Sequence, residues 1–73
     1  MSIYPNPAKD VLTIEAENIS SITIFNSLGQ RVFAEDVNAN EHLVNISGFE
    51  AGIYMVKVLT NNGEVTKRIS VVR

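Results

Sequence analysis

The chain contains no cysteine and a single histidine. The lack of cysteine excludes disulfides, thiolate metal ligands and cysteine nucleophiles. A zinc site needs about four nitrogen, sulfur or oxygen ligands, so His42 alone cannot anchor one. No serine or aspartate stands at a spacing that suggests a catalytic partner for His42, which is expected to be an exposed strand residue. We therefore expect no catalytic residue, no cofactor and no metal ion.

Strong charge and long apolar runs are also missing. The formal net charge is −2, too small to indicate a surface for nucleic acid or for a polybasic contact with a membrane. No apolar run approaches the ~20 residues of a membrane span, so stable membrane insertion is not expected. Calcium at Glu35-Asp36 with the segment 38–40 is conceivable, but the spacing of a calcium loop is absent and a solvated loop is favoured.

What the chain does contain suits one small folded domain. Hydrophobic residues make up 45% of its 73 residues and charged residues 19%. A chain of this length buries about 60% of the surface that its unfolded form exposes, so one core is expected. We predict a single domain over residues 1–73, excised from a larger secreted protein.

The dominant period of the hydrophobic pattern is two, which is typical of β-strands. Leu12 and Ile14 fall on one face, and Ile22 and Ile24 repeat the pattern. The expected strands are 11–15, 21–24, 31–34, 42–46, 53–60 and 65–72, with a shorter one at 3–4. Residues 34–40 are predicted to form a loop, and Phe49 to anchor another loop in the core. The predicted fold is all-β, a seven-stranded antiparallel β-sandwich of immunoglobulin-like type.

Two turns set the expected strand register. A three-residue loop at 27–29 with Gly29 left-handed pairs Asn26 with Gln30 and sets Ile24 opposite Val32. The pair Asn62-Gly63 predicts a two-residue hairpin turn.

That second turn determines which residues of the last two strands face each other. It sets Val56 opposite Ile69 and Tyr54 opposite Val71. In the same register Lys57 lies across from Arg68, and like charges that face each other weaken a strand pair slightly.

Four segments in order carry a resemblance to a known family. They are Tyr4 to Ala8 with Asp10 to Ile14, then Ile24 to Val32, then Gly52 to Val58, and last Thr66 to Val72. Taken together they resemble the type A C-terminal sorting domain of the type IX (Por) secretion system of Bacteroidetes, over essentially the whole chain.

The resemblance implies a domain fused to the C-terminus of a cargo protein. Such cargo passes through the periplasm and then crosses the outer membrane to the cell surface or the extracellular space. The implied partners are the secretion translocon, its shuttle components and a sortase-like protease, with the fused cargo domain at the N-terminal side. The domain would be a substrate of that machinery and not an enzyme.

Several residues are candidates for recognition, each beside a structural interpretation. Pro5, Asn6 and Pro7 make a stiff entry that separates the domain from what precedes it, and this segment is either recognised or only starts the first strand. Gly29 and Gly52 are expected to meet backbone needs, and Tyr54 to lie in the core with its hydroxyl at the rim. The remaining candidates are the cations Lys57, Lys67 and Arg68.

The cationic last strand, which also includes Arg73, has two interpretations that the sequence leaves open. Its charges are solvated edge residues, or they offer a surface to an acidic groove or to strand addition. Two other functions also stay open. One is a carbohydrate-binding or adhesive module with Phe25 and Phe33 side by side on the outer face, and the other is a structural spacer.

Overall fold

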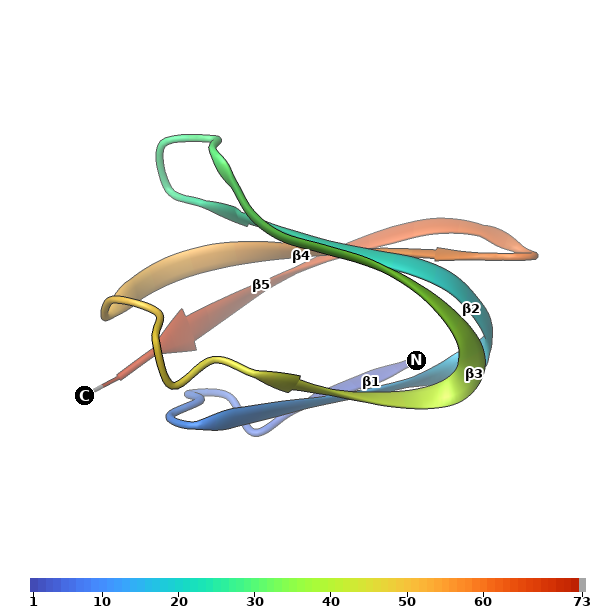
Figure 1. Cartoon of the computed structure of the whole chain (residues 1–73), viewed down its shortest axis with the longest axis horizontal. Coiled ribbons are helices and arrows are strands. Elements are labelled where there is room, and N and C mark those ends of the chain that lie inside the picture. The colour runs from blue at the N-terminus through green and yellow to red at the C-terminus, as the bar shows by residue number, and fades with distance from the viewer. Residues whose placement is uncertain (73) are drawn as a thin grey trace.

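The computed structural model describes residues 1–72, and every element in that range is a β-strand. The strands are β1 (Ser2–Tyr4), β2 (Val11–Asn26), β3 (Arg31–Asn45), β4 (Gly52–Thr60) and β5 (Gly63–Val71). They form one antiparallel sheet in the order β1-β2-β4-β5, with β3 paired to β2 (Figure 1). The prediction of an all-β antiparallel fold is confirmed.

The structure has five strands rather than the seven expected, because two pairs of expected strands are continuous. β2 contains both 11–15 and 21–24, and β3 contains both 31–34 and 42–46. The register between β2 and β3 shifts on both sides of Ile19, and such irregularities bend a strand without ending it. Asn18, beside this bend, has a positive φ of 54°.

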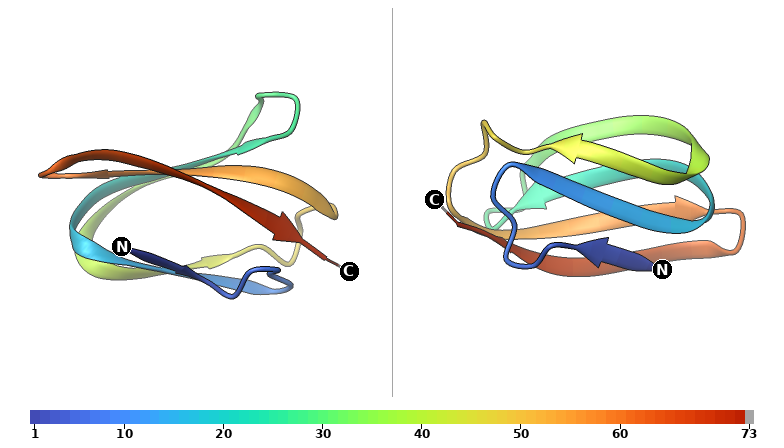
Figure 2. Two further views of the ribbon diagram at one scale, coloured as in Figure 1. Left: turned by 180° about the vertical axis from the view of Figure 1, so that it is seen from behind. Right: turned by 90° about the horizontal axis from the view of Figure 1, so that it is seen from below.

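The bend folds one sheet into two layers. The first half of β2 pairs with β1 and with the end of β3, whereas its second half pairs with the start of β3 and with β4. Figures 1 and 2 show β2 and β3 curving together from one layer into the other. An immunoglobulin-like sandwich stacks two separate sheets, so this single curled sheet differs from that expectation.

The core lies between the two layers. Leu12, Ile14, Ile22 and Ile24 are fully buried, as the period of two predicted. The rest of the buried set is Ala8, Ile19, Val37, Val44, Ile46, Tyr54, Val56, Val58, Ile69 and Val71, and Phe49 packs against it. The prediction of a loop over 34–40 is wrong, because this segment is part of β3 and buries Val37.

The turn between β2 and β3 is confirmed, but the predicted register is wrong. Gly29 has a φ of +81°, and the Asn26 N–H donates to the Gln30 carbonyl at 2.9 Å. Phe25 then pairs with Arg31 and Ile24 with Phe33, so a bulge leaves Val32 without an opposite residue. Val32 is exposed, and the larger Phe33 packs against the core in its place.

The turn between β4 and β5 lies one residue earlier than predicted. Thr60 pairs with Gly63, so Asn61 and Asn62 form the turn. The Thr60 hydroxyl fixes this geometry, since it accepts from the Asn62 N–H at 3.1 Å and donates to the Gly63 carbonyl at 3.2 Å. Lys67 rather than Ile69 therefore faces Val56.

The corrected register shifts every β4–β5 pair by two residues. Tyr54 faces Ile69 instead of Val71. A shift of two keeps each residue on its original face, so Ile69 and Val71 are still buried. Within residues 1–72, the structure contains no helix long and apolar enough to cross a membrane.

Candidate recognition site

The N-terminal turn is hydrogen-bonded to the last strand of the molecule. The Asn6 Oδ1 accepts from the Ser70 N–H at 3.1 Å, and the Asn6 Nδ2 donates to the Arg68 carbonyl at 3.4 Å. Ala8 continues this contact, because its N–H donates to the Ser70 carbonyl at 2.8 Å and its carbonyl accepts from the Val72 N–H at 2.9 Å. These four bonds join segments that are more than 60 residues apart in the chain.

The placement of this turn changes the meaning of the Pro5-Asn6-Pro7 motif. The sequence predicted a stiff segment that separates the domain from what precedes it. In the structure the motif lies outside any strand, and both of its X-Pro peptide bonds are cis. Its Asn6 amide contacts β5, so the motif and the last strand form one continuous surface.

The two cations of β5 point to opposite sides of the sheet, because neighbouring residues of a strand alternate. Lys67 is on the same face as the buried Ile69 and Val71, whereas Arg68 is on the outer face, and both cations are exposed. The two ion pairs found within residues 1–72 are Lys57 with Glu64 and His42 with Glu35. Neither includes Lys67 or Arg68, and Arg73 lies outside the described residues.

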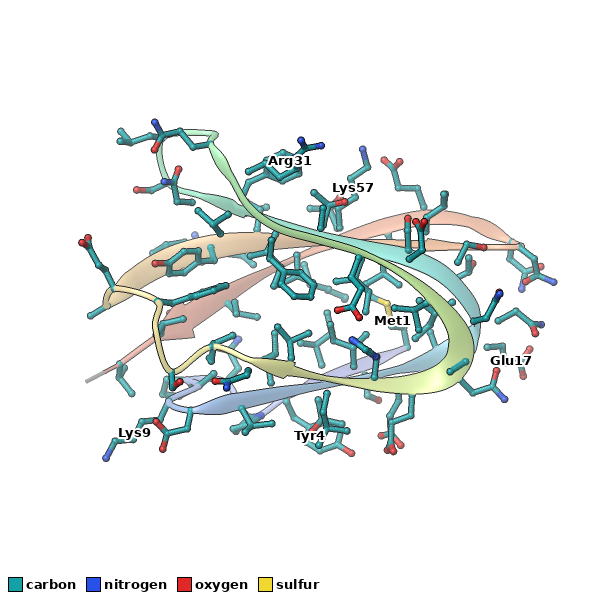
Figure 3. The ribbon with its side chains drawn as sticks, in the orientation of Figure 1. Met1, Tyr4, Lys9, Glu17, Arg31 and Lys57 are labelled. Carbon is teal, nitrogen blue, oxygen red and sulfur yellow. The ribbon has the colours of Figure 1, made fainter. Side chains whose placement is uncertain are left out.

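The prediction that Lys57 faces Arg68 is wrong because of the two-residue shift in register. Lys57 is opposite Thr66, and Arg68 is opposite Met55. The Lys57 Nζ lies 3.4 Å from the Glu64 Oε2, on the diagonal away from Arg68. Figure 3 shows Lys57 on the outer side of its layer. An exposed ion pair of this kind contributes about 0–1 kcal/mol to stability.

Gly52 and Tyr54 have structural roles near the far end of β5. Tyr54 is buried, its hydroxyl donates to the Glu50 carbonyl at 2.7 Å, and its ring centroid is 5.2 Å from that of Phe49. Gly52 pairs with Val71 and has a φ of +153°. Gly29, in the turn between β2 and β3, does not join Asn6, Lys67 and Arg68. The structure thus brings the Pro5-Asn6-Pro7 motif together with Lys67 and Arg68. The other candidates lie elsewhere: Gly29, Gly52, Tyr54 and Lys57.

A hollow of about 460 Å³ lies between β1 and β5. Its lining combines the N-terminal segment with the two cations of the last strand: Met1, Ser2, Ile3, Tyr4, Asn6, Lys67, Arg68 and Ile69. Figure 2 shows β1 and β5 running in the same direction, with the loop after β1 approaching the end of β5. No sequence pattern predicts this hollow, because it depends on the curl of the sheet.

Tyr4 is exposed at the outer side of β1 (Figure 3). A hydrogen bond with Glu15 raises the pKa of the Tyr4 phenol above its ordinary value of 10.0. The contact follows from the β1–β2 register, in which Tyr4 faces Thr13 and Ser2 faces Glu15. The contact between Tyr4 and Glu15 could not be predicted from the sequence, because so short a strand does not specify its register.

The other sites that the sequence raised are not assembled in the part of the chain that the structure describes. No three histidine, aspartate or glutamate side chains within residues 1–72 are close enough to hold a metal ion. His42 lies in β3, half-buried, with its Nε2 3.3 Å from the Glu35 Oε2. Phe33 packs against the core, while Phe25, opposite Met55, follows the buried Ile24 and faces the other way. The two phenylalanines therefore do not form a row on the outer face.

Comparison with known proteins gives a consistent set of matches. The family model described as "Secretion system C-terminal sorting domain" matches residues 2–72. The ulvan lyase NLR42 of Nonlabens ulvanivorans is 37% identical over 68 residues, which cover 89% of this chain and 13% of that protein. The beta-agarase A of Zobellia galactanivorans is 40% identical over 70 residues, covering 92% of this chain and 12% of that protein. The chain thus spans only a small part of each relative.

A solved structure has the same fold. It is PorZ, an essential bacterial surface component of the type IX secretion system of Porphyromonas gingivalis. The match has a TM-score of 0.79 at 24% sequence identity and covers 99% of this chain and 11% of that one. At this level of identity the likeness establishes the fold alone.

Proposed function

Since the chain belongs to the family of secretion system C-terminal sorting domains, we propose that it directs a protein fused to its N-terminal side across the outer membrane. A type IX sorting signal implies export to the cell surface or the extracellular space. The relatives named as ulvan lyase and agarase contain this domain as a small part of a longer chain. Their catalytic activity therefore belongs to the cargo in our proposal, and this domain is not an enzyme.

The observation that carries the proposed mode of recognition is the contact between Asn6 and β5. Hydrogen bonds of Asn6 and Ala8 to the last strand hold the N-terminal motif beside its cations. An unfolded chain would present them more than 60 residues apart. The secretion machinery would accordingly recognise the folded domain and not a linear peptide signal.

The partners that we propose are those of a secretion substrate. They are the translocon and its shuttle components, followed at the surface by a sortase-like protease that removes the domain. The route would pass through the periplasm, where the domain folds before it is recognised. The domain unit would extend over residues 1–73.

A carbohydrate-binding or adhesive module is the main alternative. It would need a row of exposed aromatic side chains, and Phe25 and Phe33 face opposite sides of β2 and β3. A structural spacer is the other alternative, and it predicts normal export after the domain is deleted.

The proposal is tested by fusing residues 3–73 to the C-terminus of a periplasmic fluorescent protein. The fusion is expressed in a bacterium with a type IX system and in a strain with a disabled translocon. We expect surface or extracellular fluorescence in the first strain only. The same fluorescent protein without the domain is the control, and it should stay in the periplasm of both strains. Retention of the folded fusion in the periplasm of both strains would contradict the proposal.

A further inference from the structure

β5 is an edge strand, because it pairs with β4 on one side and no other strand of residues 1–72 pairs with its other side. In an antiparallel strand the backbone N–H and C=O groups of alternate residues point to opposite neighbours. The N–H and the carbonyl of Ser70 and the carbonyl of Arg68 point to the outer side, since they bond Asn6 and Ala8. By the same alternation, the backbone groups of Thr66 and Glu64 also point away from β4.

Among residues 1–72, the backbone hydrogen bonds on the outer side of β5 lie at its C-terminal end. Ala8 pairs there as a parallel neighbour, in a bridge with Val71. Asn6 continues these contacts toward Arg68. Its side-chain amide accepts from the Ser70 N–H and donates to the Arg68 carbonyl, as a peptide group of a neighbouring strand would. The hydrogen bonds to the N-terminal segment stop at Arg68, and from there the hollow lies between β5 and β1.

The uncovered stretch, Glu64 to Arg68, is called the open edge below. The open edge has a net positive charge, because it contains Lys67, Arg68 and one acidic residue, Glu64. Glu64 forms an ion pair with Lys57, whereas Lys67 and Arg68 are in neither ion pair of residues 1–72. Lys67 and Arg68 project to opposite faces of the sheet. A strand added beside them would place neighbouring residues on those same two faces, next to one cation each.

We propose that the open edge binds an extended acidic segment of a partner protein as an added β-strand. Two adjacent acidic residues of that segment pair with Lys67 on one face and with Arg68 on the other. Backbone groups of Thr66 supply the hydrogen bonds that are independent of the partner's sequence, as in other complexes formed by strand addition. This inference rests on the proposed function, because the partner would belong to the export machinery.

The first test measures peptide binding to the isolated chain. The probe is a synthetic peptide of alternating valine and threonine with two adjacent aspartates at its centre, and the control peptide has lysines in their place. Nuclear magnetic resonance should show shifts of the Thr66 and Arg68 amides with the acidic peptide only. Equal binding of both peptides, or shifts confined to the outer edge of β3, would overturn the proposal. Sedimentation of the chain alone shows whether a second copy occupies the edge instead, which would also overturn it.

The second test removes the backbone donor at the open edge. Thr66→Pro deletes an N–H that does not bond β4, and proline is tolerated on the outer side of an edge strand. Thr66→Val keeps the N–H and is the matched control. We expect Thr66→Pro to lower the affinity for the acidic peptide by about tenfold or more, which corresponds to ~1.4 kcal/mol. Thr66→Val should bind the peptide as the wild type does. Thermal unfolding verifies that both variants are folded.

The same variants in the export fusion separate the two proposals. If the wild-type fusion is exported and the folded Thr66→Pro fusion is too, the sorting function holds and the open edge is not the recognition surface. If the wild-type fusion is not exported, the proposed function itself fails, whatever the peptide does. Loss of export in Thr66→Pro but not in Thr66→Val supports both.

Discussion

Asn6 makes two of the four hydrogen bonds that join the two ends of the chain, and Ala8 makes the other two. Replacing Asn6 by alanine removes the hydrogen bonds to Arg68 and Ser70 while leaving those of Ala8 in place. Because Asn6 is exposed and water can replace part of the loss, we expect the free energy of unfolding to fall by about 1 kcal/mol. Urea unfolding of Asn6→Ala measures this change.

The matched control for Asn6→Ala is Asn38→Ala, at an exposed position in β3. No side-chain hydrogen bond found within residues 1–72 includes Asn38, so its substitution should change the free energy of unfolding by less than ~0.5 kcal/mol. Equal effects of the two substitutions would show that Asn6 does not fasten the N-terminal turn to β5.

Gly29 tests whether backbone conformation or available space matters in the first hairpin. It has a φ of +81°, and a Cβ added there would meet nothing within 4 Å. Gly29→Ala should therefore cost about 1–2 kcal/mol through the left-handed conformation alone. Gly48→Ala is the control, since that position has equal space and no positive φ, and we expect no loss of stability there. Chemical unfolding compares the two, and a similar cost at both positions would refute the explanation.

At the scale of elements, the charge of β5 can be separated from its folding. Lys67→Glu with Arg68→Glu reverses two exposed cations that are in neither ion pair of residues 1–72, so the thermal midpoint should change little. If the open edge is recognised by its charge, surface delivery of the export fusion should fall severalfold. Lys9→Glu with Arg31→Glu makes the same total change of charge at residues outside β5. Normal delivery by the β5 variant at unchanged stability would contradict the electrostatic part of the proposal.

The elements also show what local sequence can specify. The alternation of apolar residues correctly predicted which faces of β2 and β4 are buried, because the side-chain period of a strand is a local property. The register between strands was less predictable. A bulge at Val32 and the Thr60 hydroxyl each moved a pairing that the turn residues alone had suggested. The open edge and the pairing of Lys57 with Glu64 depend on that register, so the sequence could not place them.

For the whole molecule, folding and export are expected to be lost together. The chain has one small core and no disulfide, so its stability should lie at the low end of ~5–15 kcal/mol. Leu12 is fully buried, and Leu12→Ala should cost about 2–5 kcal/mol. We expect this variant to be largely unfolded at growth temperature and not exported, as circular dichroism and the fusion assay would show.

Leu28→Ala makes the same substitution at a side chain that is 81% exposed. It should leave both the fold and the export unchanged. Export of an unfolded Leu12→Ala domain would indicate that a linear signal is read, and would overturn the view that the folded surface is recognised.

The sequence by itself determined the class of the fold, most of the core and the family. These follow from the period of apolar residues and from the order of short motifs, both of which are local. Only the tertiary structure decided that β2 and β3 each run through both layers, because bends within a strand depend on what it packs against. It alone placed Asn6 beside Arg68 and Ser70, since a hydrogen bond across more than 60 residues requires the whole sheet to curl first. The candidate recognition surface thus consists of residues that the sequence could name but only the fold could bring together.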